Sequence, residues 1–154
     1  VVQGYFVQLQ ALAGIIAVPF TRELYRMGKA GVAKATGRLA ALGLVVLLPV
    51  GIIGQLLFTL FYGFDTDWRT CVAGCLLGWP VFAYAPMVQT LYKHGKERAM
   101  VTAGFITAGI SAALTWLLVP HLGITGGLVA AAISQFLMLI TVRSMFHRLA
   151  HRAE

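Results

Sequence analysis

Long uncharged apolar segments alternate with short charged ones along the chain. Residues 1–21, 39–64 and 70–92 contain no Asp, Glu, Lys or Arg, and a fourth uncharged stretch covers residues 99–142. A membrane-spanning helix needs roughly 20 consecutive apolar residues, so the fourth stretch is long enough for two, with a break at Pro120, His121 and Gly123. The pattern predicts five spanning segments, near residues 1–20, 39–63, 70–92, 100–119 and 126–146.

Segments of this length predict helices. The hydrocarbon of a bilayer offers no hydrogen-bond partner to backbone groups, so only helices and closed barrels cross it. Five long apolar runs do not show the short alternating strands of a barrel. We therefore expect an all-α, polytopic membrane protein.

The composition agrees with a membrane protein. Hydrophobic residues make up 59% of the 154 residues and charged residues 11%, against roughly 45–50% and 25% in soluble domains. The helices of a soluble bundle each need a charged face, and here whole helical lengths carry no charge. A soluble helical protein is therefore a poor alternative.

The charged segments orient the predicted helices. The connections 22–38 and 93–98 and the C-terminal tail carry net charges of +4, +2 and +2, and the connection containing Asp65 and Asp67 carries −1. Together these account for the formal net charge of +7. Basic residues thus occur in every second connection, and by the positive-inside rule we expect 22–38, 93–98 and the C-terminus to be cytoplasmic.

The same pattern excludes several classes of protein. The basic residues are divided among three membrane edges without interleaved aromatics, so nucleic-acid binding is not expected. The sequence has no catalytic triad, phosphate-binding glycine loop or zinc motif, so we expect neither an enzyme nor a cofactor nor a metal. Five spans with a cytoplasmic C-terminus place Val1 outside without a leader, and we expect the chain to be the C-terminal part of a longer protein.

The break in the fourth stretch has a recognisable form. In "LVPHLGITGGLVAAAIS", residues 118–134, Pro120 is expected to end one helix at Val119, and Gly123, Gly126 and Gly127 provide a tight reversal. Small residues then open the last helix and allow a neighbouring backbone to come close; they are Ala130, Ala131, Ala132 and Ser134. This hairpin resembles the last one of the bacterial polysaccharide flippases, in the multidrug/oligosaccharidyl-lipid/polysaccharide exporter superfamily.

Two further stretches are similar to the same family. Residues 4–31, "GYFVQLQALAGIIAVPFTRELYRMGKAG", resemble its helix that ends in a proline, an aromatic and a basic amphipathic connection. Residues 90–105, "TLYKHGKERAMVTAGF", resemble its next cytoplasmic turn. Residues 19–24 lack the second proline that many members carry after this helix. The resemblance covers essentially the whole chain and corresponds to the last five of twelve helices.

The resemblance implies one lobe of a two-lobe transporter in the bacterial inner membrane, with the N-terminal lobe missing from this chain. Members move isoprenoid-diphosphate-linked oligosaccharide across the membrane by alternating access, for cell-surface polysaccharide and lipopolysaccharide synthesis. Two alternatives stay open, a drug/cation antiporter of the same superfamily and a non-transporting structural subunit, such as a helper to a glycan polymerase. The antiporter is expected to need an intramembrane carboxylate, which the predicted spans lack.

Polar residues inside the spans are candidates for a sugar-binding cavity, because a sugar crosses hydrocarbon only where polar groups replace its hydration. Amide and aromatic side chains suit this role, although each can instead bond a neighbouring helix; the candidates are Gln3, Tyr5, Gln8, Gln10, Gln55, Tyr84 and Gln89. A diphosphate needs cations, and Arg22, Arg26 and Lys29 at the cytoplasmic mouth are candidates for its headgroup, with topology and anionic lipids as the alternative roles.

Prolines inside the spans are candidates for hinges, because each frees a backbone carbonyl; they are Pro49, Pro80 and Pro86. Prolines are also frequent in membrane helices for packing alone. Gly74 and Gly78, with Cys71 and Cys75 one turn apart, form a small-residue face that predicts close helix packing. No His or carboxylate joins the two cysteines in their span, so a metal site there is rejected.

Overall fold

A computed structural model of the protein describes residue 23 and residues 26–63 and 68–151. Within this part the chain is all-helical, without strands, and has three long helices: α3 (Lys29–Tyr62), α4 (Trp68–Lys93) and α5 (Glu97–His151). The predicted first span and its candidates Gln3, Tyr5, Gln8 and Gln10, with Arg22, lie outside the described residues.

The described helices are long and apolar enough to cross a membrane. Even α4, the shortest at 26 residues, has a length of about 39 Å, against about 30 Å of hydrocarbon. Large apolar side chains cover the outside of the bundle: Val45 of α3 is 72% exposed, and Phe105 and Trp116 of α5 are 75% and 83% exposed. Such surfaces suit lipid or a further protein lobe.

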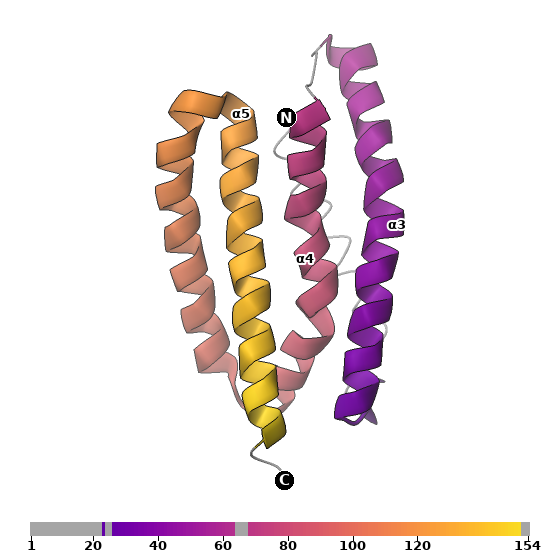
Figure 1. Ribbon diagram of the computed structural model, residues 1–154, viewed down its shortest axis with the longest axis vertical. Helices are drawn as coiled ribbons and strands as arrows, with labels where there is room; N and C mark the ends of the chain where they lie inside the picture. Colours follow the sequence, from indigo (N-terminus) through magenta and orange to yellow (C-terminus); the bar gives the residue numbers. More distant parts are fainter. Residues whose placement is uncertain (1–22, 24–25, 64–67, 152–154) are drawn as a thin grey trace.

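The 55-residue helix α5 is a hairpin of two antiparallel arms, residues 97–122 and 124–151 (Figure 1). The reversal lies at Gly123, whose φ of 57° and ψ of −138° are costly for a residue with a side chain. The two predicted spans and the break between them are therefore found. The end of the first arm was predicted wrongly, because helical geometry continues past Val119 and Pro120 and stops only at Gly123.

The other helix bounds agree with the predicted spans except at the start of α3. Helix α4 begins and ends within two residues of the predicted span 70–92, whereas α3 begins ten residues before the predicted start at 39. Residues 29–38 contain no proline and several alanines, so nothing ends the helix where the apolar region ends. The predicted amphipathic connection is thus partly an extension of α3.

Helix α4 lies between α3 and the second arm of α5 (Figure 1). Its two faces carry the core: Leu47 of α3 and Leu128 of the second arm pack around Leu77 and Phe82, all at most 3% exposed. A second cluster of buried side chains includes Leu91, Met100 and Val142, and joins the end of α4 to both arms of α5.

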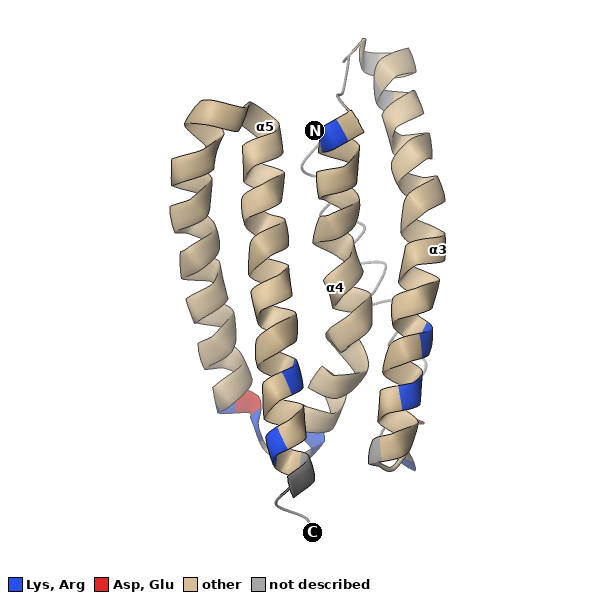
Figure 2. Cartoon of the chain, viewed as in Figure 1, with Lys and Arg blue, Asp and Glu red and all other residues tan. Residues whose placement is uncertain are grey.

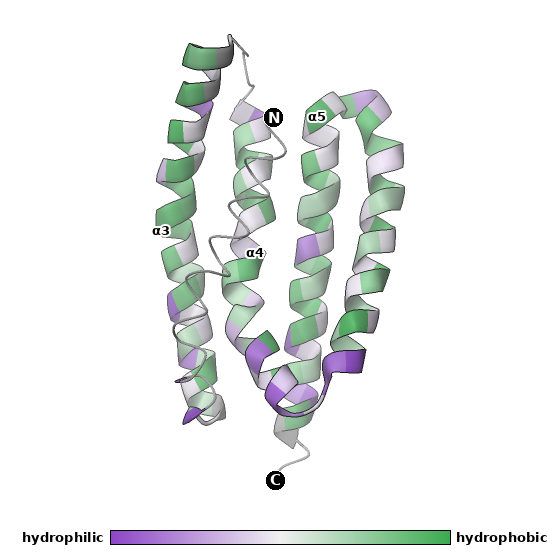
Figure 3. Ribbon diagram, turned by 180° about the vertical axis from the view of Figure 1, so that it is seen from behind, coloured by the Kyte–Doolittle hydropathy of each residue, from purple (hydrophilic) through white to green (hydrophobic). Residues whose placement is uncertain are grey.

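Charged residues gather at one end of the bundle, the lower end in Figure 2. This basic end contains the starts of α3 and α5 and the ends of α4 and α5. Its described basic side chains are Arg26, Lys34, Arg38, Lys93, Lys96, Arg98, Arg143 and Arg148, and Lys29 is the first residue of α3. The hydrophilic positions in Figure 3 are also concentrated there. The two basic connections predicted to share a side of the membrane thus lie at the same end, with Arg69 at the opposite one.

Candidate functional site

A cavity of about 360 Å³ lies between α4 and the two arms of α5. We call it the hairpin cavity. Each element contributes polar side chains to an otherwise apolar wall, and those side chains are Tyr84, Thr107, Ser111, Ser134 and Gln135. Its volume is at the lower end of the range of small-molecule sites, about 300–1,000 Å³.

A hydrogen bond between two helices lies in the wall of this cavity. The Tyr84 hydroxyl on α4 donates to Oε1 of Gln135 on the second arm, at 2.9 Å. The Gln135 amide keeps two N–H donors on Nε2. The phenol oxygen keeps acceptor capacity, and the tyrosine ring gives a flat face. The pair therefore combines donor, acceptor and aromatic surface at one place in the wall.

Two of the hydroxyl groups in the wall are oriented by their own helices. Ser134 Oγ donates to the Ala130 carbonyl at 3.0 Å, and Thr107 Oγ1 lies 3.0 Å from the carbonyls of Ala103 and Gly104. Their protons are thus held by the backbone, and their lone pairs remain as acceptors. All the residues that line the cavity are uncharged. Such a wall can bind a neutral polyhydroxyl group, and among the described residues it offers no charged partner for an ion.

Small residues in the second arm make room for the hairpin. A Cβ on Gly126 would lie 2.6 Å from the Leu118 carbonyl oxygen of the first arm, so the two backbones approach too closely there for any side chain. Ala130 is fully buried, and Ala132 and Ser134 are 6% exposed. A close approach of two backbones is thus present at Gly126, and three of the small residues predicted to allow one are buried.

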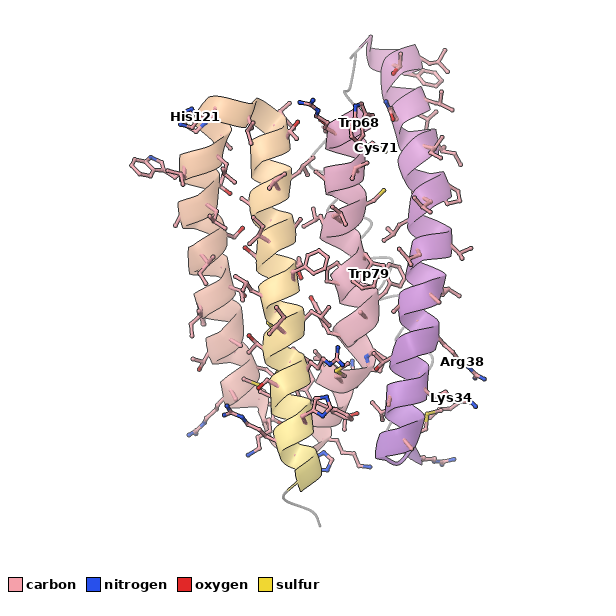
Figure 4. The ribbon with its side chains drawn as sticks, viewed as in Figure 1. Lys34, Arg38, Trp68, Cys71, Trp79 and His121 are labelled. Atoms are coloured by element: carbon pink, nitrogen blue, oxygen red, sulfur yellow. The ribbon has the colours of Figure 1, made fainter. Side chains whose placement is uncertain are left out.

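A second hollow lies between α3 and α4, and we call it the α3–α4 groove. Its volume is about 520 Å³ and its lining is almost entirely apolar, with Gln55 as its one amide. Figure 4 shows Trp68, Cys71 and Trp79 along this side of α4. The indole N–H of Trp79 donates to the Ala40 carbonyl of α3 at 3.0 Å, and its ring meets Phe136 at 5.9 Å between centroids.

The small-residue face predicted on α4 packs against α3. A Cβ on Gly51 would lie 2.6 Å from Cys75 Sγ and 3.2 Å from Cys71 Sγ, and one on Gly78 would lie 3.1 Å from Leu47. The two thiols therefore lie over a glycine of the neighbouring helix. Cys75 Sγ also lies 3.4 Å from the Leu47 carbonyl.

The structure separates the described candidate residues. Tyr84 lines the hairpin cavity and Gln55 lines the α3–α4 groove, whereas Gln89 is half-buried near the end of α4 and lines neither. Arg26 precedes α3 and Lys29 opens it, both at the basic end. The sequence analysis did not select Gln135, Thr107, Ser111 or Ser134 as cavity residues.

The three candidate hinge prolines differ in environment. Pro80 and Pro86 are buried in α4 on either side of Tyr84, and α4 is bent in its lower half (Figure 1). Pro49 is exposed on α3. The Thr90 hydroxyl donates to the Pro86 carbonyl at 3.0 Å. Any bending of α4 at these prolines would move Tyr84 relative to Gln135.

Comparison of the chain with protein-family models, with curated proteins and with solved structures finds no match.

Proposed function

We propose that the chain is a lobe of a transporter that moves isoprenoid-diphosphate-linked oligosaccharide across the bacterial cytoplasmic membrane, without enzymatic chemistry. The resemblance of residues 4–31, 90–105 and 118–134 to the polysaccharide flippases supports this. In this proposal residues 1–20 form a further span, a second lobe completes the passage, and transport proceeds by alternating access.

The observation that carries the proposal is the uncharged polar wall of the hairpin cavity. Polar side chains inside a membrane bundle are costly unless they are hydrogen-bonded, so a cluster of them is a candidate functional site. Here Tyr84, Gln135 and three hydroxyl side chains converge on one hollow from three helical segments. Amides, hydroxyls and an aromatic face are the groups that bind sugar hydroxyls and ring faces, so we assign the oligosaccharide to this cavity.

The proposed orientation places the basic end in the cytoplasm, together with the C-terminus. This follows the positive-inside rule for the basic residues at the ends of α3, α4 and α5. In this proposal Arg22, Arg26 and Lys29 are at the cytoplasmic mouth and meet the substrate's diphosphate before transport. Among the described residues no Asp or Glu occurs between Ala30 and Tyr62, between Trp68 and Lys93 or between Arg98 and His151, which favours this substrate over a cation.

The test is a flipping assay on the complete protein in proteoliposomes. A fluorescent isoprenoid-diphosphate-linked oligosaccharide is loaded, and a membrane-impermeant quencher reports its transfer between leaflets. Gln135→Leu is expected to slow transfer roughly tenfold or more, because a buried site loses its hydrogen bonds to the sugar. Gln89→Leu is the matched control: it is the same substitution at a half-buried glutamine outside the cavity, and we expect nearly unchanged transfer.

Two results would contradict the proposal. Transfer by the wild-type protein no faster than in protein-free vesicles would favour a non-transporting subunit. Equal transfer rates for Gln135→Leu and the wild type would show that the cavity is not part of the passage. Single cysteines introduced along the cavity wall, after replacement of Cys71 and Cys75, give an independent measurement: a passage admits a water-soluble thiol reagent at mid-bilayer, and a structural subunit does not.

A further inference from the structure

A third and smaller pocket lies at the basic end, apart from both hollows described above. It has a volume of about 140 Å³ and is formed by the end of α4, the start of α5 and the end of α5. We call it the rim pocket. Its lining combines cations with apolar side chains: Leu91, Lys96, Ala99, Met145, Arg148 and Leu149.

The turn between α4 and α5 fixes Lys96 at this pocket. Gly95 has a positive φ of 66°, the Gly95 N–H donates to the Tyr92 carbonyl at 3.0 Å, and the Lys96 N–H donates to the Leu91 carbonyl at 3.1 Å. These two bonds form the Schellman motif that ends many helices at a glycine. The backbone of Lys96 is therefore held against the last turn of α4.

The rim pocket has an apolar floor and two basic side chains at its edge. Leu91 is fully buried, and Met145 and Leu149 are half-buried beside it. Within the described part of the chain, neither Lys96 nor Arg148 takes part in an ion pair, although Glu97 is the next residue. Two unpaired cations thus border an apolar hollow at a helix end, where the headgroups of a bilayer lie.

We propose that the rim pocket binds the phosphate headgroup of an anionic membrane phospholipid, with the start of its acyl chain against Met145 and Leu149. Arg148 can bind two phosphate oxygens through its planar guanidinium, and Lys96 adds a point charge. A soluble anion would leave the apolar floor exposed, whereas a lipid covers it. This site goes beyond the proposed transport and does not depend on it.

Lipid binding is measured by native mass spectrometry of the complete, delipidated protein, titrated separately with phosphatidylglycerol, phosphatidylcholine and a polyisoprenyl diphosphate. The variant Lys96→Gln/Arg148→Gln is compared with Lys34→Gln/Arg38→Gln. The control removes the same charge from the same end, but from exposed positions that point away from α4 on α3 (Figure 4). A Lys96→Arg/Arg148→Lys variant changes the same two positions but keeps both charges. It therefore controls for damage to the fold caused by substitution at these positions.

We expect the rim variant to weaken phosphatidylglycerol binding roughly 10- to 30-fold and the α3 control to weaken it less than about threefold. The charge-keeping variant should retain binding, and phosphatidylcholine should bind weakly to every variant. Equal losses in the rim variant and the α3 control would overturn the proposal, because total charge would then explain binding. A loss confined to polyisoprenyl diphosphate would also overturn it, because the phosphate would then belong to the substrate. Neither outcome depends on the flipping rate.

Discussion

The two sides of α4 are built on different principles. Toward α3, α4 places small residues and thiols, so that Leu47 packs over Gly78 and the two cysteines over Gly51. Toward α5, it places Tyr84, which bonds Gln135 across a hollow with a polar wall. One side is therefore an apolar seam with an apolar groove, and the other is an uncharged polar site.

This difference indicates which side of α4 carries the proposed function. In lipid, helices associate through close packing and interhelical hydrogen bonds, because the hydrophobic effect does not drive their contact. The α3–α4 seam combines close packing with a hydrogen bond from Trp79 to the backbone of α3, beside a groove with an apolar lining. The α4–α5 side has hydrogen bonds between side chains and a hollow with polar groups in its wall. We therefore expect substitutions on the α3 side to change stability alone, and those on the α5 side to change transport as well.

The largest effect is expected from Gly126→Ala. The new Cβ would lie 2.6 Å from the Leu118 carbonyl oxygen, so the arms of the hairpin must separate and the cavity must change shape. We expect a loss of about 2–3 kcal/mol in the free energy of unfolding, with loss of transport. Thermal unfolding in detergent and the flipping assay measure the two effects.

Gly109→Ala is the control for this prediction. Gly109 lies in the first arm of the same hairpin, and a Cβ there meets nothing within 4 Å. Replacing a helical glycine by alanine should then stabilise by up to about 1 kcal/mol. Equal destabilisation by both substitutions would show that the close approach at Gly126 is not what matters.

The sequence predicted the arrangement of the described helices well. Charge alone located α4 to within two residues and predicted that 22–38 and 93–98 lie at the same end. The reversal was also predicted, at Gly123, Gly126 and Gly127, but the end of the first arm was assigned to Pro120, and of the three glycines only Gly123 departs from helical geometry. A proline can occupy the last turn of a helix, whereas the turn itself needs the left-handed φ that Gly123 provides.

The residues of the hairpin cavity were harder to predict from the sequence. Tyr84 was selected because it is polar within an apolar span, and the same reason applied to Gln135. Gln135 was not among the predicted cavity residues. Its partner is 51 positions away on another helix, and only the packing of α4 against the second arm brings the two together. One sequence does not specify which faces of two apolar helices meet.

Gly43→Ala tests the α3 side of α4. We expect it to lower the free energy of unfolding by less than Gly126→Ala does. A Cβ at Gly43 would lie 2.9 Å from Cβ and Cγ of Phe82, which is 1% exposed and has little room to move. We expect about 1–2 kcal/mol of destabilisation in the same unfolding assay. Gly37→Ala, in the same helix with nothing within 4 Å, should be neutral or stabilising. A Gly43→Ala protein that stays folded but stops flipping would contradict the separation of the two sides.

The smallest change in stability is expected from Tyr84→Phe, which removes one hydroxyl and keeps the ring. Interhelical hydrogen bonds in membranes contribute about 0.6 kcal/mol on average, so the unfolding midpoint should hardly move. Thr70→Val removes a hydrogen bond of the same kind between the same two elements, the 2.8 Å bond of Thr70 to Thr125, outside the cavity. If the Tyr84–Gln135 bond only joined helices, both variants would flip substrate at the same rate. If the cavity binds sugar, Tyr84→Phe should be several-fold slower than Thr70→Val at equal stability, because only Tyr84 is placed to contact the substrate.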